Sequence, residues 1–287
     1  MRKIVCLATS PWYPIPTRKQ QVMSRIPDAE ILYFDPSVTY LAPLKDKAAR
    51  PGLSNYKKEG VHPQENITVY SLPPVLPVFY KFRWINKLNQ RRMARFVRRK
   101  MQAHGFTDAV LWVYSPVTAD LVDLVPHKGL VYDCVDRHSA YGGLMDPTLV
   151  DRMGLELAGK TDRTFATADA LAERLRAAQP NTVMIPNGAN FERFVQAAQP
   201  QPVPEDLRDI PHPIFGFVGA LQSCIEYDYL EAAAKARPDW SFVLIGKEKP
   251  GVDLTALHAM PNVHFLGLKS NEQLPQYLAH FDACLNL

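Results

Sequence analysis

Two carboxylates and an imidazole stand close together in the segment VYDCVDRHSAYGG, residues 131–143. They follow an apolar run typical of a strand in a buried parallel sheet, and ligands of such sheets bind beyond the carboxyl ends of the strands. A carboxylate or an imidazole there can accept a proton from a substrate hydroxyl or hydrogen-bond a sugar. Asp136 and His138 are therefore candidate catalytic residues. The spacing is equally consistent with structural roles, in which Asp133 caps a helix and His138 is an ordinary loop residue.

Two glycines of the second half suggest a place for a phosphate. Gly219 in GFVGALQS directly follows an apolar run, and its missing side chain would let backbone amides approach a phosphate near a helix N-terminus. Gly246 in VLIGKE repeats this arrangement, and Lys247 after it can pair with a diphosphate as a point charge. A tight turn and a solvated lysine explain the same residues, so each signal is weak alone.

The elements that position these residues follow the rhythm of parallel βα units, in which each apolar run precedes a turn and a helical pattern. The expected strands of the first half are Lys3–Thr9, Glu30–Phe34, Ile67–Leu72, Ala109–Tyr114, Gly129–Asp133, Arg163–Thr167 and Thr182–Ile185. The expected elements of the second half are strands Pro213–Val218, Trp240–Ile245, Val263–Leu266 and Asp282–Leu285, and helices Tyr227–Ala236, Leu254–Met260 and Gln273–His280.

The chain is long enough for two domains with well-buried cores. The segment AAQPQPVPEDLRDIPHP, residues 197–213, is so rich in proline that neither a helix nor a central strand can persist there. We therefore expect an α/β protein with one Rossmann-like domain over residues 1–200 and a second over residues 201–287. About four strands follow the proline-rich segment, fewer than a doubly wound domain of ordinary size has, so we expect the second domain to be incomplete.

The composition, with 47% hydrophobic and 22% charged residues, is that of an ordinary globular protein. The opening MRKIVCLATSPWYP has an apolar run too short for a signal-peptide core or a membrane span, which favours a cytoplasmic protein. Cys6, Cys134, Cys224 and Cys284 are widely separated and lie in or beside apolar runs, without the close pairing of a zinc site. We expect all four to be reduced thiols in the core.

Basic residues are concentrated in KFRWINKLNQRRMARFVRRK, residues 81–100, which holds nine Lys or Arg and no acid. As a helix, this segment would place Phe82, Ile85, Leu88, Met93, Phe96, Val97 and Met101 near one side. It is either a surface helix whose cationic heads stay in water or an element that binds an anionic membrane surface. Nucleic acid is the least favoured partner, because the rest of the chain is net acidic and has no recognised nucleic-acid motif.

Several segments, in order, resemble the GT-B glycosyltransferases of the family 4 kind that build bacterial surface polysaccharides. The resemblance runs from about residue 108 to the end of the chain. Its segments are LVYDCVDRHSAYGG, DRTFATADALAERL, VMIPNGANFERF, PIFGFVGAL, PDWSFVLIGKE and PNVHFLGLKSNEQLPQYLAHFDACLNL.

The resemblance implies that the first domain binds the acceptor and the second a nucleotide-diphosphate sugar, the co-substrate, with the sugar transferred to a polysaccharide or lipid-linked acceptor. The implied acceptor-side residues are Ser10, Trp12, Tyr114 and Ser115, together with Asp136 and His138, and the implied donor-side residues are Gly219, Gln222, Gly246, Lys247 and Gly267. It implies no cofactor and no metal ion, because helix N-termini and basic side chains can neutralise the diphosphate.

The sequence departs from the family pattern in the second half. Many relatives carry an arginine and a lysine just after the glycine at the position of Gly219, where this chain reads ALQSCIEYDYL. The acidic motif that grips the donor sugar in relatives would fall after Leu287. A non-catalytic relative or fragment that binds nucleotide or a partner enzyme therefore remains an alternative, as do a membrane-surface module and a GT-B epimerase.

Overall fold

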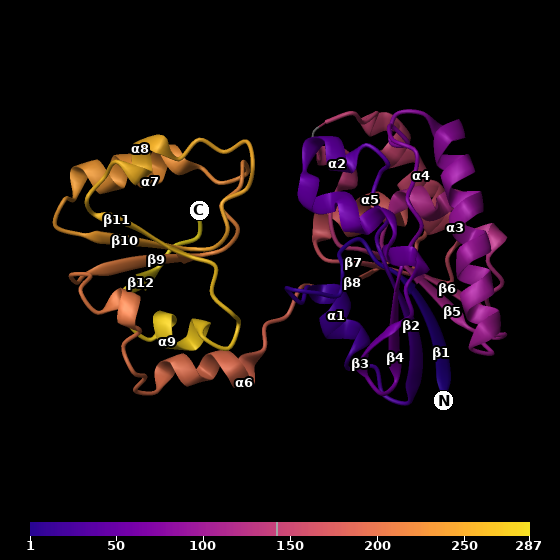
Figure 1. The fold of residues 1–287 in the computed structure, drawn as a ribbon, viewed down its shortest axis with the longest axis horizontal. Coiled ribbons are helices and arrows are strands. Elements are labelled where there is room, and N and C mark those ends of the chain that lie inside the picture. Colours follow the sequence, from indigo (N-terminus) through magenta and orange to yellow (C-terminus); the bar gives the residue numbers. More distant parts are fainter. Residues whose placement is uncertain (142) are drawn as a thin grey trace. The chain divides into compact units, whose positions relative to one another are not determined.

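The computed structural model describes residues 1–141 and 143–287, so Gly142, in the segment VYDCVDRHSAYGG, lies outside the described residues. The chain forms two compact units, Met1–Asn187 and Gly188–Leu287 (Figure 1). Each unit has its own sheet and its own core, which confirms the expected α/β class with two Rossmann-like parts.

An eight-stranded sheet with the order β3-β4-β2-β1-β5-β6-β7-β8 organises the first unit. Its strands are β1 (Arg2–Leu7), β2 (Ala29–Asp35), β3 (Val61–Gln64), β4 (Ile67–Ser71), β5 (Val110–Val113), β6 (Gly129–Cys134), β7 (Arg163–Ala166) and β8 (Val183–Met184). All the pairings are parallel except that of the edge strand β3 with β4. Every strand expected in the first half is present, whereas β3 was not expected.

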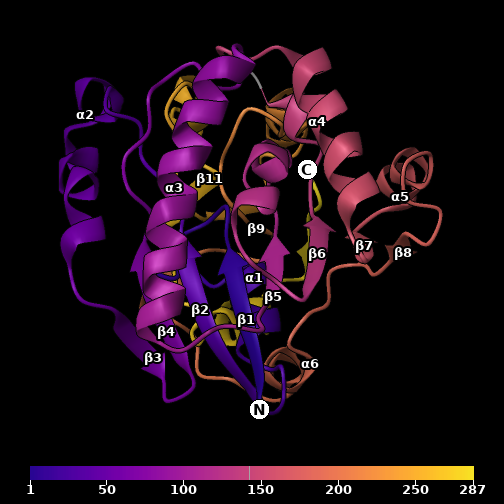
Figure 2. The same ribbon diagram turned by 90° about the vertical axis from the view of Figure 1, so that its right-hand side faces the viewer.

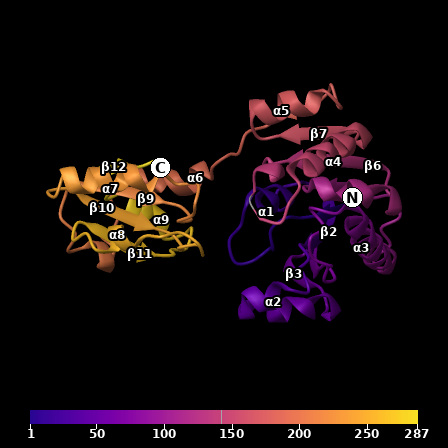
Figure 3. The same ribbon diagram turned by 90° about the horizontal axis from the view of Figure 1, so that it is seen from above.

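Helices cover both faces of this sheet because successive strand residues point to opposite sides. The helices are α1 (Arg18–Met23), α2 (Ala42–Lys45), α3 (Arg83–Ala103), α4 (Pro147–Lys160) and α5 (Asp169–Arg176). Val97 of α3 and Met153 of α4 pack on the face that contains Val5, whereas Met23 of α1 packs on the face that contains Ile4. Figure 2 shows α3 in front of the strands, and Figure 3 shows α1 and α3 on opposite sides of them.

The basic segment forms α3, but its buried side differs from the expected one. Leu88 and Phe82 are 46% and 43% exposed, so they do not belong to the buried stripe. Three amides, Asn86, Asn89 and Gln90, are buried instead. They are tolerated in the core because each finds hydrogen-bond partners there. Apolar periodicity alone could not have revealed these partners, because Asn86 and Asn89 bond backbone groups outside the helix, whereas Gln90 bonds Asn86 one turn away.

The cysteines separate into two pairs. Cys6 and Cys134 are buried thiols of the first unit, as expected, and burial raises the pKa of both. Cys224 and Cys284 are free thiols that lie exposed in the second unit, so the expectation of a core position was wrong for them. Cys224 stands in a loop, and Cys284 stands in a two-residue strand whose side chains are not fully covered.

The second unit contains a four-stranded parallel sheet with the order β11-β10-β9-β12. Its strands are β9 (Ile214–Val218), β10 (Ser241–Ile245), β11 (Val263–Gly267) and β12 (Ala283–Cys284), and its helices are α6 (Phe191–Phe194), α7 (Tyr227–Ala236), α8 (Thr255–His258) and α9 (Leu274–Leu278). Figure 1 shows α7 and α8 on one face of this sheet and α9 on the other. Leu230 and Leu257 fill the first interface, and Tyr277 fills the second.

In the sequence, the boundary between the units lies between Asn187 and Gly188, earlier than the boundary expected between residues 200 and 201. The proline-rich segment belongs to the second unit because one side chain within it and one just before it pack in the core of that unit. Phe194 of α6 and Leu207 pack with Tyr277 of α9. As expected, residues 197–213 form neither an α-helix nor a strand, although a short 3₁₀ helix spans Glu205–Leu207. The prolines do not keep the segment apart from a core.

Candidate functional site

A buried ion pair occupies the carboxyl edge of the first unit's sheet. Arg18, in the first turn of α1, places its Nε 3.2 Å from Oδ2 of Asp133 at the end of β6. Its guanidinium also donates to the carbonyl oxygen of Pro186 and the side-chain oxygen of Asn187. Asp133 is fully buried, and burial raises the pKa of its carboxyl although Arg18 acts in the opposite direction. The pair therefore joins α1, β6 and the segment after β8.

Tyr114 and Lys19 lie beside this ion pair. Tyr114 is fully buried next to Asp133, yet its hydroxyl and Asp133 Oδ1 have no hydrogen-bond partner of normal geometry within the described residues. The Lys19 amine lies 5.4 Å from the centroid of the Tyr114 ring. Burial lowers the pKa of Lys19, while the nearby carboxylates of Asp136 and Asp133 oppose this change. Sequence reasoning missed Arg18 and Lys19, for which the only signal was a basic pair soon after the first strand.

Asp136 and His138 lie at the same edge, as expected. Asp136 is exposed, and its carboxylate interacts with the hydroxyl of Tyr141. His138 is 8% exposed, with Nδ1 3.2 Å from the backbone oxygen of Asp136. Burial lowers the pKa of His138, so its imidazole is neutral at pH 7. A neutral imidazole beside an exposed carboxylate can accept a proton or orient a hydroxyl group.

The two residues expected after β1 have mainly structural contacts. The hydroxyl of Ser10 lies 3.0 Å from that of Thr17, and its backbone oxygen accepts a bond from Tyr33. Trp12 packs edge-on against Tyr33 in the core, at 4.9 Å between ring centroids. Its backbone nitrogen donates to Asp35, whose carboxyl has a pKa raised by burial to about 6. Trp12 thus presents little of its ring at the surface, and its expected role toward the acceptor stays a prediction.

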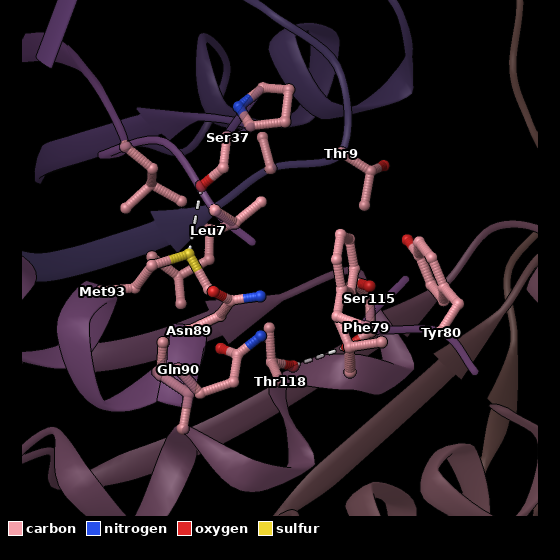
Figure 4. A pocket seen from close by; sticks show the side chains of 16 residues that line it. Leu7, Thr9, Ser37, Phe79, Tyr80, Asn89, Gln90, Met93, Ser115 and Thr118 are labelled. Atoms are coloured by element: carbon pink, nitrogen blue, oxygen red, sulfur yellow. Dashed lines mark hydrogen bonds between the residues drawn. The ribbon is translucent and has the colours of Figure 1, made fainter. Parts of the chain in front are cut away.

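A pocket of about 130 Å³ opens at the carboxyl ends of β1, β2, β4 and β5 and is closed on one side by α3 (Figure 4). Ser115, one of the expected acceptor residues, lines it together with Thr118. Asn89 and Gln90 of α3 contribute two amide side chains that sequence reasoning did not place at a site. They were missed because the basic residues of this helix dominate its pattern.

Three of the expected donor residues meet at the carboxyl edge of the second unit. The Gly219 amide donates to the Ile245 oxygen, and the Gly246 amide donates to the Gly267 oxygen, each at 2.9 Å. These two amides therefore bond neighbouring strands, and the expected approach of backbone amides to a phosphate near Gly219 stays a prediction. A Cβ at Gly246 would lie 1.7 Å from the Gly219 oxygen. Glycine is required here because the two backbones touch.

Gln222 and Lys247 are exposed beside these glycines. Gln222 belongs to the loop that leads to α7, and its backbone oxygen accepts bonds from Ile225 and Tyr227. Lys247 follows β10, and its side chain has no ion-pair partner in the part of the chain that the structure describes. An exposed ammonium without such a partner, at the carboxyl edge of this sheet, suits an anionic ligand.

We expect Gly246→Ala to lower the free energy of unfolding by about 3 kcal/mol, because the added methyl overlaps the backbone of Gly219 and forces β9 and β10 apart. Gly188→Ala is the matched control, since a Cβ there meets nothing within 4 Å. Denaturant unfolding of both variants measures the difference. Equal stability of the two would mean that the contact between the strand ends relaxes without cost.

The chain thus has two α/β units, each built on a largely parallel sheet with polar groups at its carboxyl edge. These are the features of the GT-B fold. A sucrose-phosphate synthase from Thermosynechococcus elongatus superposes with a TM-score of 0.71 at 13% identity, covering 99% of this chain and 75% of that one. HepE of Anabaena, solved in complex with UDP and glucose, gives a TM-score of 0.62 at 16% identity, covering 99% and 73%. At these identities the likeness establishes the fold.

Among curated proteins, the chain is similar to TuaH of Bacillus subtilis, which is described as a putative teichuronic acid biosynthesis glycosyltransferase. The identity is 23% over 185 residues, which cover 60% of this chain and 46% of TuaH. The match thus spans about half the length of that relative. No family model matches the chain. None of the helices in the described ranges is both long and apolar enough to cross a membrane.

Proposed function

We propose that this protein is a glycosyltransferase that moves a sugar from a nucleotide-diphosphate sugar to a glycan or lipid-linked acceptor. The observation that carries the proposal is the carboxyl edge of the second unit. Gly219 and Gly246 touch there, and Lys247 follows β10, exposed and without an ion-pair partner among the described residues. The solved HepE complex with UDP and glucose, which has the same fold, supports a UDP-sugar as the donor. The similarity to TuaH supports a surface-polymer acceptor.

Donor binding tests this proposal directly. UDP-sugars at 100 times their Kd should stabilise the full chain by about 2.7 kcal/mol, which is measured as a rise in Tm. Lys247→Ala should weaken the Kd about tenfold, because a hydrogen bond to a charged phosphate is lost. Lys235→Ala, in an exposed pair with Glu231, is the control and should leave the Kd unchanged. Absence of stabilisation by any nucleotide sugar would contradict the proposal.

Transfer should proceed in the presence of EDTA, since helix termini and Lys247 are available to stabilise the leaving diphosphate. This metal independence stays a prediction until turnover is measured with and without the chelator. Binding of the donor without transfer to any acceptor would instead favour the alternative of a nucleotide-binding relative.

We further propose that α3 binds an anionic membrane surface, which would place the protein at the cytoplasmic face of the membrane. Trp84 and Leu88 are 64% and 46% exposed, and they lie one turn apart on the outer side of the helix. Arg91, Arg95 and Arg98 continue the exposed side. Aromatic and basic residues together on an exposed helix side are typical of interfacial binding.

Replacing five exposed arginines of α3 by Gln should abolish sedimentation with anionic vesicles, because each basic residue contributes about 1 kcal/mol near such a surface. The five are Arg91, Arg92, Arg95, Arg98 and Arg99. Trp84→Ala should weaken binding less and should not change its salt dependence. Zwitterionic vesicles and high salt are the controls. Binding that survives the five substitutions would return α3 to a solvated surface role.

A further inference from the structure

The pocket under α3 has apolar walls and few polar groups. Leu72, Val75, Phe79, Met93 and Leu121 form much of its lining. A dry cavity of 150 Å³ holds a benzene ring, so about 130 Å³ suits a group of roughly four to six non-hydrogen atoms. Apolar walls favour a group that carries a methyl or a short hydrocarbon.

Most of the polar groups around the pocket already have partners. Asn89 accepts from the Leu76 nitrogen at 2.9 Å and donates to the Leu76 oxygen at 3.0 Å. The Thr118 hydroxyl donates to the Ser115 backbone oxygen at 2.6 Å. Gln90 and Ser115 are the exceptions. Gln90 is 1% exposed and Ser115 is 8% exposed, and neither Gln90 Oε1 nor Ser115 Oγ has a hydrogen-bond partner within the described chain. A buried acceptor left unpaired costs about 1–3 kcal/mol, so a ligand that donates to it gains that energy.

The orientation of the Gln90 amide is fixed by a chain of hydrogen bonds. Its Nε2 donates to Asn86 Oδ1 at 3.1 Å. Asn86 must present that oxygen because its own nitrogen donates to the Val117 oxygen and to Asp120, both at 2.9 Å. Asp120 in turn pairs with Arg83 at 3.0 Å. Flipping the Gln90 amide would place two NH₂ groups against each other, so Oε1 stays the unpaired acceptor.

Hydroxyl groups accompany this acceptor. Ser115 and Tyr80 both line the pocket, with their hydroxyls beside each other. Figure 4 shows Gln90, Ser115 and Tyr80 around the same space, with Phe79 and Met93 completing the walls. The pocket thus offers one free acceptor, hydroxyl donors and an apolar surface.

From this complementarity we infer that the pocket receives the N-acyl group of an amino sugar in the acceptor. The acetamido group matches each feature: its N–H donates to Gln90 Oε1, its carbonyl oxygen accepts from a Ser115 or Tyr80 hydroxyl, and its methyl meets the apolar walls. A sugar hydroxyl could also donate to Gln90, but it would leave those walls without a partner. The inference rests on the proposed function, because it names the class of acceptor that the first unit of a glycosyltransferase would select.

Binding of methyl glycosides tests the inference without any donor. In saturation-transfer NMR with the full chain, methyl N-acetylglucosaminide and methyl N-acetylgalactosaminide should bind, with the N-acetyl methyl as the most strongly saturated group. Methyl glucoside and methyl galactoside should bind about five- to tenfold more weakly. Equal affinity for the matched N-acetyl and hydroxyl glycosides would overturn the inference, and so would a weakly saturated methyl.

Two variants assign the binding to the pocket. Gln90→Leu removes the acceptor and should reduce N-acetyl glycoside affinity five- to tenfold while leaving UDP-sugar stabilisation unchanged. Ser115→Ala removes one hydroxyl with little change of volume, and it should weaken binding similarly even if Gln90→Leu fails to fold. Unchanged affinity in the folded variants would overturn the inference. Glycoside binding and UDP-sugar binding are measured separately. Absence of UDP-sugar binding would therefore contradict the proposed transferase, whereas the glycoside measurements would still test the pocket.

Discussion

Replacing Arg18 with Met should lower the free energy of unfolding by about 3 kcal/mol at pH 7, because it leaves the carboxylate of Asp133 buried without its charged partner. The Asp133 side chain is only 1% exposed, so water cannot take the place of the guanidinium. The same change frees the segment after β8, to which Arg18 also donates. Arg25→Met is the control, since Arg25 is exposed and, among the described residues, its side chain bonds only its own helix and the turn after it.

The loss should depend on pH. Burial already raises the folded-state pKa of Asp133 above the ordinary value of about 4, so ionisation of this carboxyl destabilises the fold as the pH rises through that window. Loss of Arg18 raises the pKa further. The deficit of Arg18→Met should therefore be small near pH 4.5 and largest near pH 8. Adding Asp133→Asn should recover most of it, and a deficit independent of pH would mean that the charge is not its cause.

Asp136→Asn should reduce kcat by about 10²-fold or more, the usual loss when a general base is removed. We propose this role because Asp136 is an exposed carboxylate at the edge that also holds neutral His138, and it lies near the amine of Lys19. The change keeps the size and hydrogen-bonding capacity of the side chain but removes its charge. His138→Ala should have the smaller effect.

Product stereochemistry, followed by NMR in the same assay, completes this test. An enzyme that inverts the anomeric centre needs a base for the acceptor hydroxyl, whereas a retaining enzyme needs none and would lose less activity. Asp108→Asn is the matched control, because Asp108 is an exposed carboxylate that precedes β5 at the opposite edge of the sheet. Wild-type turnover in Asp136→Asn with unchanged acceptor KM would identify Asp136 as a structural loop residue.

The strands were predictable because the apolar runs that form them are local in sequence. Helix α7 was predicted with its observed bounds, and the strands differ from expectation by a residue or two at their ends. Strand β3 has the sequence VHPQ, which is not an apolar run, and Val61, His62 and Gln64 are exposed. Only its pairing with β4 identifies it as a strand. Local pattern could not reveal a strand that exists through its neighbour.

The site was only partly predictable because its decisive contacts join distant segments. Asp136 and His138 were found from their position after a strand, but Arg18 meets Asp133 across more than a hundred residues. Gly219 and Gly246 were predicted to lie near a phosphate, and their backbone contact with each other could not be read from the sequence. Gln90 sits in a helix whose composition points to its charged surface, so the amide beneath was hidden in the pattern.

The contrast between the exposed and the buried thiols makes the second unit selectively addressable. Maleimide reagents attack thiolates that water can reach, so Cys6 and Cys134, buried and with raised pKa values, should stay unmodified in the folded protein. Cys224 lies in the loop between Gly219 and α7, whereas Cys284 lies on β12. With Cys284 changed to Ser, a fluorophore at Cys224 would report directly on whatever enters the edge of this sheet, and no engineered cysteine would be needed.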